Sequence, residues 1–564
     1  MNKTLTGLCA IAALCVARSN AEVGPPVASL DAPTEHANPT PKDDRPNFVF
    51  IITDDMERSM FNALAEGKGR TLTPNLDRLV EEGVLMTGQH VASAVCTPSR
   101  YNVLTGRYAS RAMPVGPNDQ AVVAFETHIK PSDATLPKIL QTAGYRTGMV
   151  GKNHVIQAPG IPDIPLDADP ANSEVAETLR AYSADNEAAL QKAGFDEAGG
   201  LFPGNPDELR PRALRIHNMD HIAEAAVRFL DNRASAKPFF IYLATTLPHG
   251  PVEESRSWNS DPSLGPYGLR DTATPVLPPR NTLRERLEKA GLPQESLDDP
   301  EQGAAIMLAL DDAIGAVMER LEANGQLENT IVFFFNDHGT DAKGTLYQGG
   351  LQYPSVVWRK GGFPCGPGSE ALISNIDFAP TILDFAGVPF ERDSFDGQSF
   401  KNILLGGEAP RDRVLYAEMG FTRAIRVGDW KYIAIRYPEK TGNMSLEERR
   451  QRLEEWNAHL AERGIPAVNT DPAAPFSHLS DIPGGAHAEH STTGKKPHYY
   501  DPDQLFNLAD DASEEVNLAG DPAHTARLAA MKDKMGLVLQ SLPGRFGEFN
   551  QPAEKKIPQS APIQ

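Results

Sequence analysis

At 564 residues the chain is longer than one ordinary domain, and a hydrophobic content of 40% is ample for a buried core. A formal net charge of −21 excludes general nucleic-acid binding, which requires a basic face. No segment reaches the roughly 18 consecutive apolar residues that a membrane-spanning helix needs, so we predict no membrane span. We therefore expect one large domain and a smaller one, and any anion site must be locally positive within an acidic chain.

The first 21 residues have the pattern of an export signal. Lys3 gives a positive start, residues 5–17 form a short apolar run, and residues 19–21 (Ser-Asn-Ala) form a small-x-small cleavage site. This pattern predicts a periplasmic or extracellular protein. Residues 22–45 are rich in Pro, Ala, Asp and Thr and are expected to form a flexible leader.

Between residues 46 and 400, apolar runs alternate with amphipathic segments, which is typical of an α/β domain. In chain order, the pattern predicts strands at residues 47–52, 145–150, 238–243, 330–335 and 353–358. Helices are predicted at residues 74–82, 136–143, 219–230 and 306–324, the first of them capped by Thr73. The polar segments 159–215 and 255–300 are expected to be excursions from the core.

Polar side chains follow four of these strands at the point where each strand ends. They are Asp54 and Asp55, Lys152 and His154, His249, and Asp337 and His338, in chain order. Ligands of open α/β sheets bind beyond the carboxyl ends of the strands. If the four strands are neighbours in one sheet, these seven side chains lie together at one edge.

Residues 94–106 (AVCTPSRYNVLTG) place a cysteine and an arginine at the start of a predicted helix. Proline is tolerated in a first helical turn, where its missing N–H would have no partner in any case. The free N–H groups and the helix dipole at that end favour an anion, and Arg100 offers a planar charged fork for an oxyanion. Two other interpretations of Cys96 are a structural thiol and a disulfide with Cys365, the only other cysteine outside the export signal.

This run resembles the signature of the type I sulfatases of the alkaline phosphatase superfamily, C-x-P-S-R followed by a short spacer and Leu-Thr-Gly. In that family the cysteine is converted after translation to formylglycine, an aldehyde whose hydrate is the nucleophile. Residues 248–251 (PHGP) are similar to the family's P-H-x-P loop, and residues 377–383 (DFAPTIL) to its D-x-x-P-T-x-L helix start. Residues 151–154 (GKNH) match G-K-x-H, except that Asn153 stands where the family usually has an aromatic residue.

The resemblance implies an α/β fold, the alkaline-phosphatase-like sandwich with a central, mostly parallel sheet flanked by helices. It also implies a small C-terminal α+β subdomain with a four-stranded antiparallel sheet. We predict a catalytic domain at residues 46–400, the subdomain at 401–545 and a loose tail at 546–564. Residues 438–500, with a charged helix near 446–462, form an insertion that either shapes the substrate pocket or is a solvated surface elaboration.

The three aspartates Asp54, Asp55 and Asp337 offer hard oxygen ligands, which suit calcium or magnesium. Adjacent carboxylates beyond a buried strand are costly unless a positive charge holds them. The motif match adds His338 as a ligand and directs the modified Cys96 toward the metal. The resemblance implies one calcium ion per chain.

The resemblance also implies how the other side chains act. Arg100, Lys152 and Lys343 would stabilise the charged oxygens of the sulfuryl group. His249, alone or together with Lys343, would protonate the departing alcohol, and His154 would take a proton from the second hydroxyl of the hydrate.

The function implied is that of a sulfuric ester hydrolase, which requires a formylglycine-generating or sulfatase-maturating enzyme as a partner. Export and a positive pocket favour a sulfated carbohydrate as substrate. A formylglycine-dependent phosphodiesterase or phosphonate monoester hydrolase shares the signature and the fold and stays an alternative. A catalytically inactive homologue that binds sulfated glycans is a second alternative, although Cys96, His249 and the aspartates are all present.

Overall fold

The computed structural model describes residues 43–114, 121–123, 126–232, 237–270, 275–293, 296, 303–410, 412–437, 443–462, 472 and 496–550. The predicted export signal lies outside the described residues, and so does most of the predicted leader, of the 438–500 insertion and of the tail. Within the part of the chain that the structure describes, no helix is long and apolar enough to cross a membrane.

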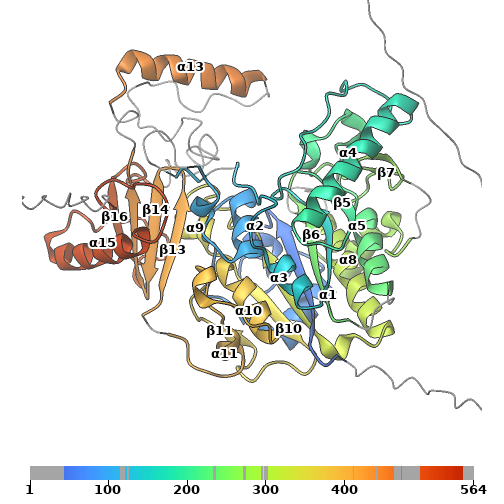
Figure 1. Ribbon diagram of the computed structural model, residues 1–564, viewed down its shortest axis with the longest axis horizontal. Helices are drawn as coiled ribbons and strands as arrows, with labels where there is room; N and C mark the ends of the chain where they lie inside the picture. Colours follow the sequence, from blue (N-terminus) through green and yellow to red (C-terminus); the bar gives the residue numbers. More distant parts are fainter. Residues whose placement is uncertain are drawn as a thin grey trace, which may run out of the picture. The chain divides into compact units, whose positions relative to one another are not determined.

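An eight-stranded, mostly parallel sheet carries the fold (Figure 1). Its strand order is β11-β2-β10-β9-β1-β6-β4-β5, and the five strands from β9 to β5 run parallel, whereas β10 is antiparallel to both of its neighbours. The strands are β1 (Asn47–Asp54), β2 (Val84–Met86), β4 (Arg146–Lys152), β5 (Glu197–Phe202), β6 (Phe239–Pro248), β9 (Thr330–Asn336), β10 (Ser355–Arg359) and β11 (Gly368–Ser369). All five predicted strands are present, and β6 continues to Pro248, past its predicted end at residue 243.

Helices cover both faces of this sheet, which explains why its strands are continuously apolar. In β1, Phe48, Phe50 and Ile52 enter the core on one face, while Val49 and Ile51 enter the core on the other. The first face packs against α2 (Cys96–Thr105), α3 (Leu136–Thr142) and α10 (Phe378–Phe385), and the second against α1 (Pro74–Glu82), α5 (Met219–Asp231), α6 (Leu283–Ala290) and α8 (Ala304–Ala323). The predicted α/β sandwich is therefore confirmed.

Two segments that were expected to leave the core contribute regular structure to the fold. Residues 159–215 contain the helix α4 (Ser173–Lys192) and the edge strand β5, which pairs with β4. Residues 255–300 contain a short hairpin of β7 (Leu264–Gly265) and β8 (Gly268–Leu269), followed by α6. The sequence of β5, Glu-Ala-Gly-Gly-Leu-Phe, lacks the β-branched residues and alternation that predict a strand.

Helix α1 is capped from a distant helix and not by the residue that precedes it. The Thr73 hydroxyl donates to Asp77 at 3.0 Å and makes no capping bond. Instead, the buried Asp311 carboxylate of α8 accepts the backbone N–H groups of Asn75 at 3.1 Å and Leu76 at 2.8 Å. A carboxylate at a helix N-terminus is favoured by the helix dipole, so this contact stabilises α1 and joins it to α8.

The C-terminal subdomain is built on a four-stranded antiparallel sheet, as the resemblance implies. Its strands, in spatial order, are β13 (Val414–Met419), β14 (Thr422–Val427), β15 (Trp430–Ile435) and β16 (Asp503–Asn507). Helix α15 (Thr525–Leu539) packs on it, and the buried Phe546 lies in the same apolar cluster. The predicted charged helix is present as α13 (Leu446–Glu462).

Candidate active site

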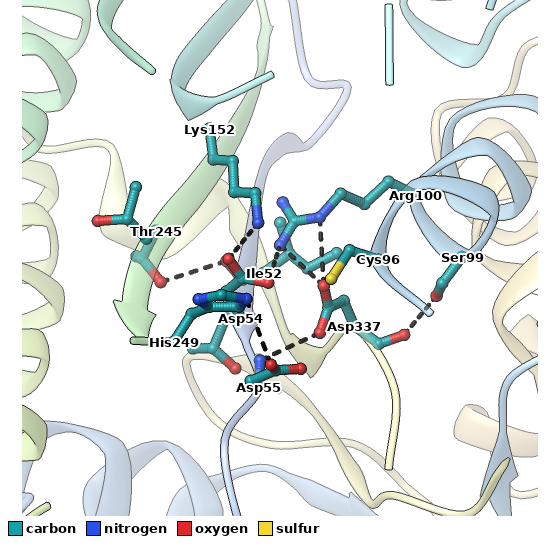
Figure 2. Close-up of polar contacts among 12 residues, drawn as sticks. Ile52, Asp54, Asp55, Cys96, Ser99, Arg100, Lys152, Thr245, His249 and Asp337 are labelled. Atoms are coloured by element: carbon teal, nitrogen blue, oxygen red, sulfur yellow. Dashed lines mark hydrogen bonds and ion pairs between the residues drawn. The ribbon is translucent and has the colours of Figure 1, made fainter. Parts of the chain in front are cut away.

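The four strands that precede the predicted site residues are neighbours in the sheet, in the order β9-β1-β6-β4. Their carboxyl ends meet because the strands are parallel and closely in register. Thr53 of β1 lies opposite Asn336 of β9, and Asp54 lies opposite Pro248 of β6. The polar side chains beyond these strands therefore gather at one edge of the sheet (Figure 2).

Asp54, the last residue of β1, is fully buried and lies between two cations. Its Oδ2 accepts a hydrogen bond from Lys152 Nζ, and its Oδ1 lies 3.4 Å from Arg100 Nη2. Figure 2 shows both cationic side chains pointing toward this carboxylate. Although burial opposes ionisation, the charges of Lys152, His249 and Arg100 lower the pKa of Asp54 well below its ordinary value. Asp54 is therefore an ionised carboxylate inside the protein.

Asp55 has a left-handed backbone with a φ of 57°, a conformation that is unusual for a residue other than glycine. This turn directs its carboxylate back toward the sheet edge. Oδ2 lies 2.5 Å from Lys343 Nζ and 3.4 Å from His249 Nε2, and Oδ1 lies 3.0 Å from His338 Nε2. Its backbone N–H donates to Asp337 Oδ1 at 3.3 Å. Asp55 thus joins the ends of β1, β6 and β9.

Arg100, on the first turns of α2, is completely buried and faces the aspartates. Its Nη2 donates to Asp337 Oδ2 at 3.0 Å, while its Nη1 is buried and has no hydrogen-bond partner in the described part of the chain. Ser99 Oγ donates to the backbone carbonyl of Asp337, and Asn375 Nδ2 donates to Ser99 Oγ at 2.9 Å. These bonds hold the N-terminal turn of α2 against the end of β9.

Cys96 is the first residue of α2, and its side chain is 1% exposed. Its sulfur lies 3.5 Å from His338 Nε2 and 4.0 Å from Lys343 Nζ. Cys96 and Cys365 are both free, so the disulfide alternative is wrong. Burial raises the pKa of the Cys96 thiol, and a thiol that keeps its proton is a poor nucleophile. Unmodified Cys96 is therefore badly suited to attack a substrate.

Lys152 was predicted to follow β4 and is instead its last residue, whereas His154 lies two residues beyond the strand; both enter the same centre. Lys152 is fully buried, whereas the backbone of His154 has a φ of 50°, again in the left-handed region. Burial and the charge of Lys152 lower the pKa of His154 well below its ordinary value, so its imidazole is neutral. Asn153, the departure from the family pattern, stabilises its own turn through two hydrogen bonds with Ile156. Its Oδ1 accepts the Ile156 N–H at 2.9 Å, and its Nδ2 donates to the Ile156 carbonyl at 3.0 Å.

His249 lies in the loop after β6 and is partly exposed. Its Nδ1 bonds the backbone carbonyl of Gly250 at 2.8 Å, so Nδ1 is the protonated donor of that contact. Nε2 is left facing the site, 3.4 Å from Asp55 Oδ2.

A divalent cation fits the groups gathered here. Asp54 Oδ1 is buried and accepts no hydrogen bond from the described residues. Ligand atoms of Asp54, Cys96 and Asp337 lie within 4.8 Å of one another, and so do those of Asp55, Cys96 and His338. Burial opposes a charge on His338, but Asp337 and Asp55 raise the pKa of His338 well above its ordinary value. The position thus favours positive charge, and the imidazole must lose its proton to become a metal ligand.

The charge balance of the centre also fits a cation. Its members are three carboxylates, Asp54, Asp55 and Asp337, and three cationic side chains, Arg100, Lys152 and Lys343. These formal charges cancel, so a divalent cation would make the centre net positive. A positive, buried centre within an acidic chain attracts an anionic group.

Asn336, the last residue of β9, organises the site although no role was predicted for it. Its Oδ1 accepts the Thr53 hydroxyl at 2.8 Å and the Met56 N–H at 2.9 Å, and its Nδ2 donates to the His338 carbonyl at 2.5 Å. It therefore ties the loop after β1 to the loop after β9. The sequence does place Asn336 at the end of a predicted strand and next to Asp337, and this position could have identified it as a site residue.

Asn205, in the turn after β5, is a second residue without a predicted role. Its Oδ1 accepts Lys152 Nζ at 2.6 Å, and its Nδ2 donates to Glu208 Oε1 at 3.0 Å. Lys152 is thereby held between Asp54 and Asn205. Because β5 itself was not expected, nothing in the sequence placed this turn at the site.

Comparison with known proteins agrees with this geometry. Residues 46–388 match the family model described as Sulfatase. Arylsulfatase G of Canis lupus familiaris is 24% identical over 540 residues, covering 89% of this chain and 86% of that protein. N-acetylglucosamine-6-O-sulfatase of Bacteroides thetaiotaomicron is 26% identical over 465 residues, covering 69% and 76%.

Among solved structures, the PsFucS1 sulfatase of Pseudoalteromonas sp. has the same fold, with a TM-score of 0.55 at 19% identity over 89% of this chain and 92% of that one. The family match extends over more than half of the chain and includes every strand end that contributes to the site. From the fold, the site and this match together, we conclude that the chain belongs to the sulfatase family, within the alkaline phosphatase superfamily.

Proposed function

We propose that this sulfatase uses a formylglycine made from Cys96, together with one calcium ion, to hydrolyse sulfate esters of carbohydrates outside the cytoplasm. The observation that carries the proposal is the position of Cys96 at the N-terminus of α2. There it is buried among the carboxylates and cations of the centre, with a thiol that is a poor nucleophile. An aldehyde at this position, once hydrated, supplies an oxygen nucleophile. The modification requires a maturating enzyme as a partner.

The side chains of the centre have distinct tasks in this reaction. Arg100, Lys152 and Lys343 bind the sulfuryl oxygens, and Nη1 of Arg100, which has no partner among the described residues, is available for such a contact. When both of its ring nitrogens carry a proton, His249 donates the proton on Nε2 to the oxygen of the departing alcohol, while Nδ1 keeps its bond to the Gly250 carbonyl. The neutral His154 accepts a proton when sulfate is released. The aspartates and His338 would hold calcium, which supplies Lewis-acid stabilisation of the charged oxygens.

Charge and predicted location support a sulfated carbohydrate. A sulfate monoester carries one negative charge, whereas a phosphate monoester carries nearly two at neutral pH. The single divalent centre with three basic side chains suits the smaller charge, although phosphodiesters carry the same charge as sulfate monoesters. The export pattern of residues 1–21 supports a location outside the cytoplasm, where sulfated polymers that do not cross membranes are found. The name of one relative, N-acetylglucosamine-6-O-sulfatase, is consistent with a sugar substrate.

The experiment that tests this function compares specificity constants on a panel of sulfated mono- and oligosaccharides, an aryl sulfate, and matched phosphate diesters. We expect the highest kcat/KM on a sulfated sugar. A higher kcat/KM on a phosphodiester would identify the phosphodiesterase alternative, and binding of sulfated glycans without turnover of any ester would identify the inactive homologue.

The assignment of His249 as the leaving-group acid predicts a dependence on the leaving group. An alkoxide leaves far less readily than a nitrophenolate, so loss of the acid harms a sugar sulfate more. We expect His249→Ala to lower kcat on a sugar sulfate by roughly 10³-fold and on nitrophenyl sulfate by about tenfold. His524→Ala, a change at a partly exposed histidine of the C-terminal subdomain, is the control and should leave both rates unaffected. Equal losses on the two substrates in His249→Ala would assign the acid to another residue.

A further inference from the structure

Two loops flank the end of β4, where Lys152 lies, because β4 stands between β6 and β5 in the sheet. One loop follows β5 and covers residues 203–218, and the other follows β6 and covers residues 249–260. We call these two loops together the rim. They are joined directly, since Arg256 Nε donates to the Arg215 carbonyl at 3.0 Å and the His217 N–H donates to the Arg256 carbonyl at 2.8 Å.

The rim is tied to the catalytic centre at both loops. The first loop reaches Lys152 through Asn205, with 2.6 Å between Oδ1 and Nζ. The buried His217 of the same loop bonds Thr246 Oγ1 of β6 at 2.8 Å, next to the start of the His249 loop. The rim is therefore bonded to Lys152, which binds the sulfate in the proposed reaction, and to the strand that precedes His249. Leu209, which accepts a hydrogen bond from Arg215, lies four residues after Asn205 in the same loop.

Four arginines lie on this rim, and two of them lack an acidic partner. Arg256 pairs with Asp207, and Arg210 lies 3.2 Å from Asp163. Arg212 and Arg215 have no carboxylate within 4.0 Å among the described residues. The rim's three other acidic groups have other partners: Glu208 accepts from Asn205, Glu253 lies 3.7 Å from Arg256, and Glu254 accepts from Asn259.

Arg215 is fixed in place but keeps its terminal amines free. Its Nε donates to the Leu209 carbonyl at 2.9 Å, while Nη1 and Nη2 make no hydrogen bond within the described ranges. The side chain is half-buried, and Arg212 beside it is exposed. Burial lowers the pKa of Arg215. The charge of Asp207 raises this pKa, whereas the charges of Arg212, Arg256 and Arg210 lower it further. An anion bound between Arg212 and Arg215 would relieve this repulsion.

We propose that Arg212 and Arg215 form a second anion subsite, which binds a carboxylate or a further sulfate on the sugar that neighbours the scissile ester. The guanidinium of Arg215 offers two free N–H donors side by side, the geometry that carboxylate and sulfate oxygens accept in pairs. A substrate with one sulfate fills the catalytic centre alone, whereas a substrate with two anionic groups fills both positions. This inference rests on the proposed function, because it names the class of glycan that the sulfatase prefers.

The experiment compares three oligosaccharides with the same scissile sulfate: one with a neutral neighbouring sugar, one with a uronate and one with a second sulfate. Wild-type enzyme should prefer a dianionic substrate. Arg215→Gln should raise KM for that substrate by about tenfold to a hundredfold with little change in kcat, because a charge-assisted pair is lost from binding and not from the reacting centre. The loss on the neutral substrate should be at least about five times smaller. Whichever dianionic substrate loses more identifies the preferred anion.

Arg212→Gln is the second variant and should give a smaller effect in the same direction, because an exposed arginine binds an anion more weakly than a half-buried one. Its side chain makes no hydrogen bond or ion pair with the described residues, so this change should leave folding intact. Arg78→Gln, on the exposed surface of α1, is the matched control and should behave as wild type on all three substrates. Calorimetry with two disaccharides that lack the scissile ester, one with a uronate and one with a sulfate on the neighbouring sugar, measures the subsite without turnover. Equal losses on all three substrates, or equal binding of both disaccharides by wild type and Arg215→Gln, would overturn the subsite, whereas absence of any sulfate release by wild type would overturn the proposed function.

Discussion

Replacing Cys96 by alanine will abolish hydrolysis of sulfate esters, with a loss in kcat of roughly 10⁴-fold or more. A loss of this size is expected when the nucleophile is removed from a group of catalytic residues that act together. Cys365→Ala is the matched control, because Cys365 is the other free cysteine of the described chain and lies outside the site. It should retain wild-type activity.

Mass spectrometry of the peptide that carries position 96 will complete this test. We expect an aldehyde in active protein, which a hydrazine traps with loss of activity. Fully active protein that contains only the Cys96 thiol would contradict the formylglycine assignment, and a thiol nucleophile would then have to act despite its raised pKa.

Removal of the divalent cation will also abolish turnover, because the buried carboxylates and the sulfuryl oxygens would lose the charge that holds them together. Elemental analysis should find about one metal ion per chain, and calcium should restore activity after chelation better than magnesium or zinc. Asp55→Asn should lower the metal content, and it should lower kcat by at least about 10²-fold. It is the aspartate of choice because its side chain is 21% exposed, so its substitution disturbs the core least.

Asp231→Asn, at an exposed pair with Arg320, is the matched control and should bind metal as wild type does. A calcium-saturated chelator is the control for chelation. Two tightly bound zinc ions per chain would indicate a phosphatase-type centre and would contradict the proposed ligand set.

The edge of the sheet where the site lies was predictable because its signal is local. A buried parallel strand shows as a continuous apolar run, and a polar pair directly after it, such as Asp54 and Asp55, marks the strand end. Cys96 and Arg100 were found for a similar reason, since thirteen consecutive residues carry the whole signature. These elements could be inferred without knowledge of what packs against them.

Features that depend on distant partners were not predictable in this way. Strand β5 has the weak sequence Glu-Ala-Gly-Gly-Leu-Phe and is recognised only by its pairing with β4. Asn205 was missed because it depends on that strand. The cap of α1 was wrongly assigned to Thr73, because Asp311 lies 235 residues from the Leu76 N–H that it accepts. Local patterns report burial and strand ends, whereas such contacts follow from the assembled fold.

The burial of Cys96 determines when the proposed modification can take place. Every residue of α2 is buried, and the helix is held at its start by Ser99 and Asn375, so no enzyme could reach the thiol without opening the core. The maturating enzyme must therefore act on the nascent or still unfolded chain. Folding afterwards leaves the aldehyde next to the partly exposed side chains of Asp55, His249 and Lys343, where a small anionic group has access but a second protein does not. A molecule that folds first is trapped with a thiol for its lifetime. The specific activity of any preparation will consequently report the outcome of a race between modification and folding, and slowing folding should raise the active fraction without any change in the enzyme itself.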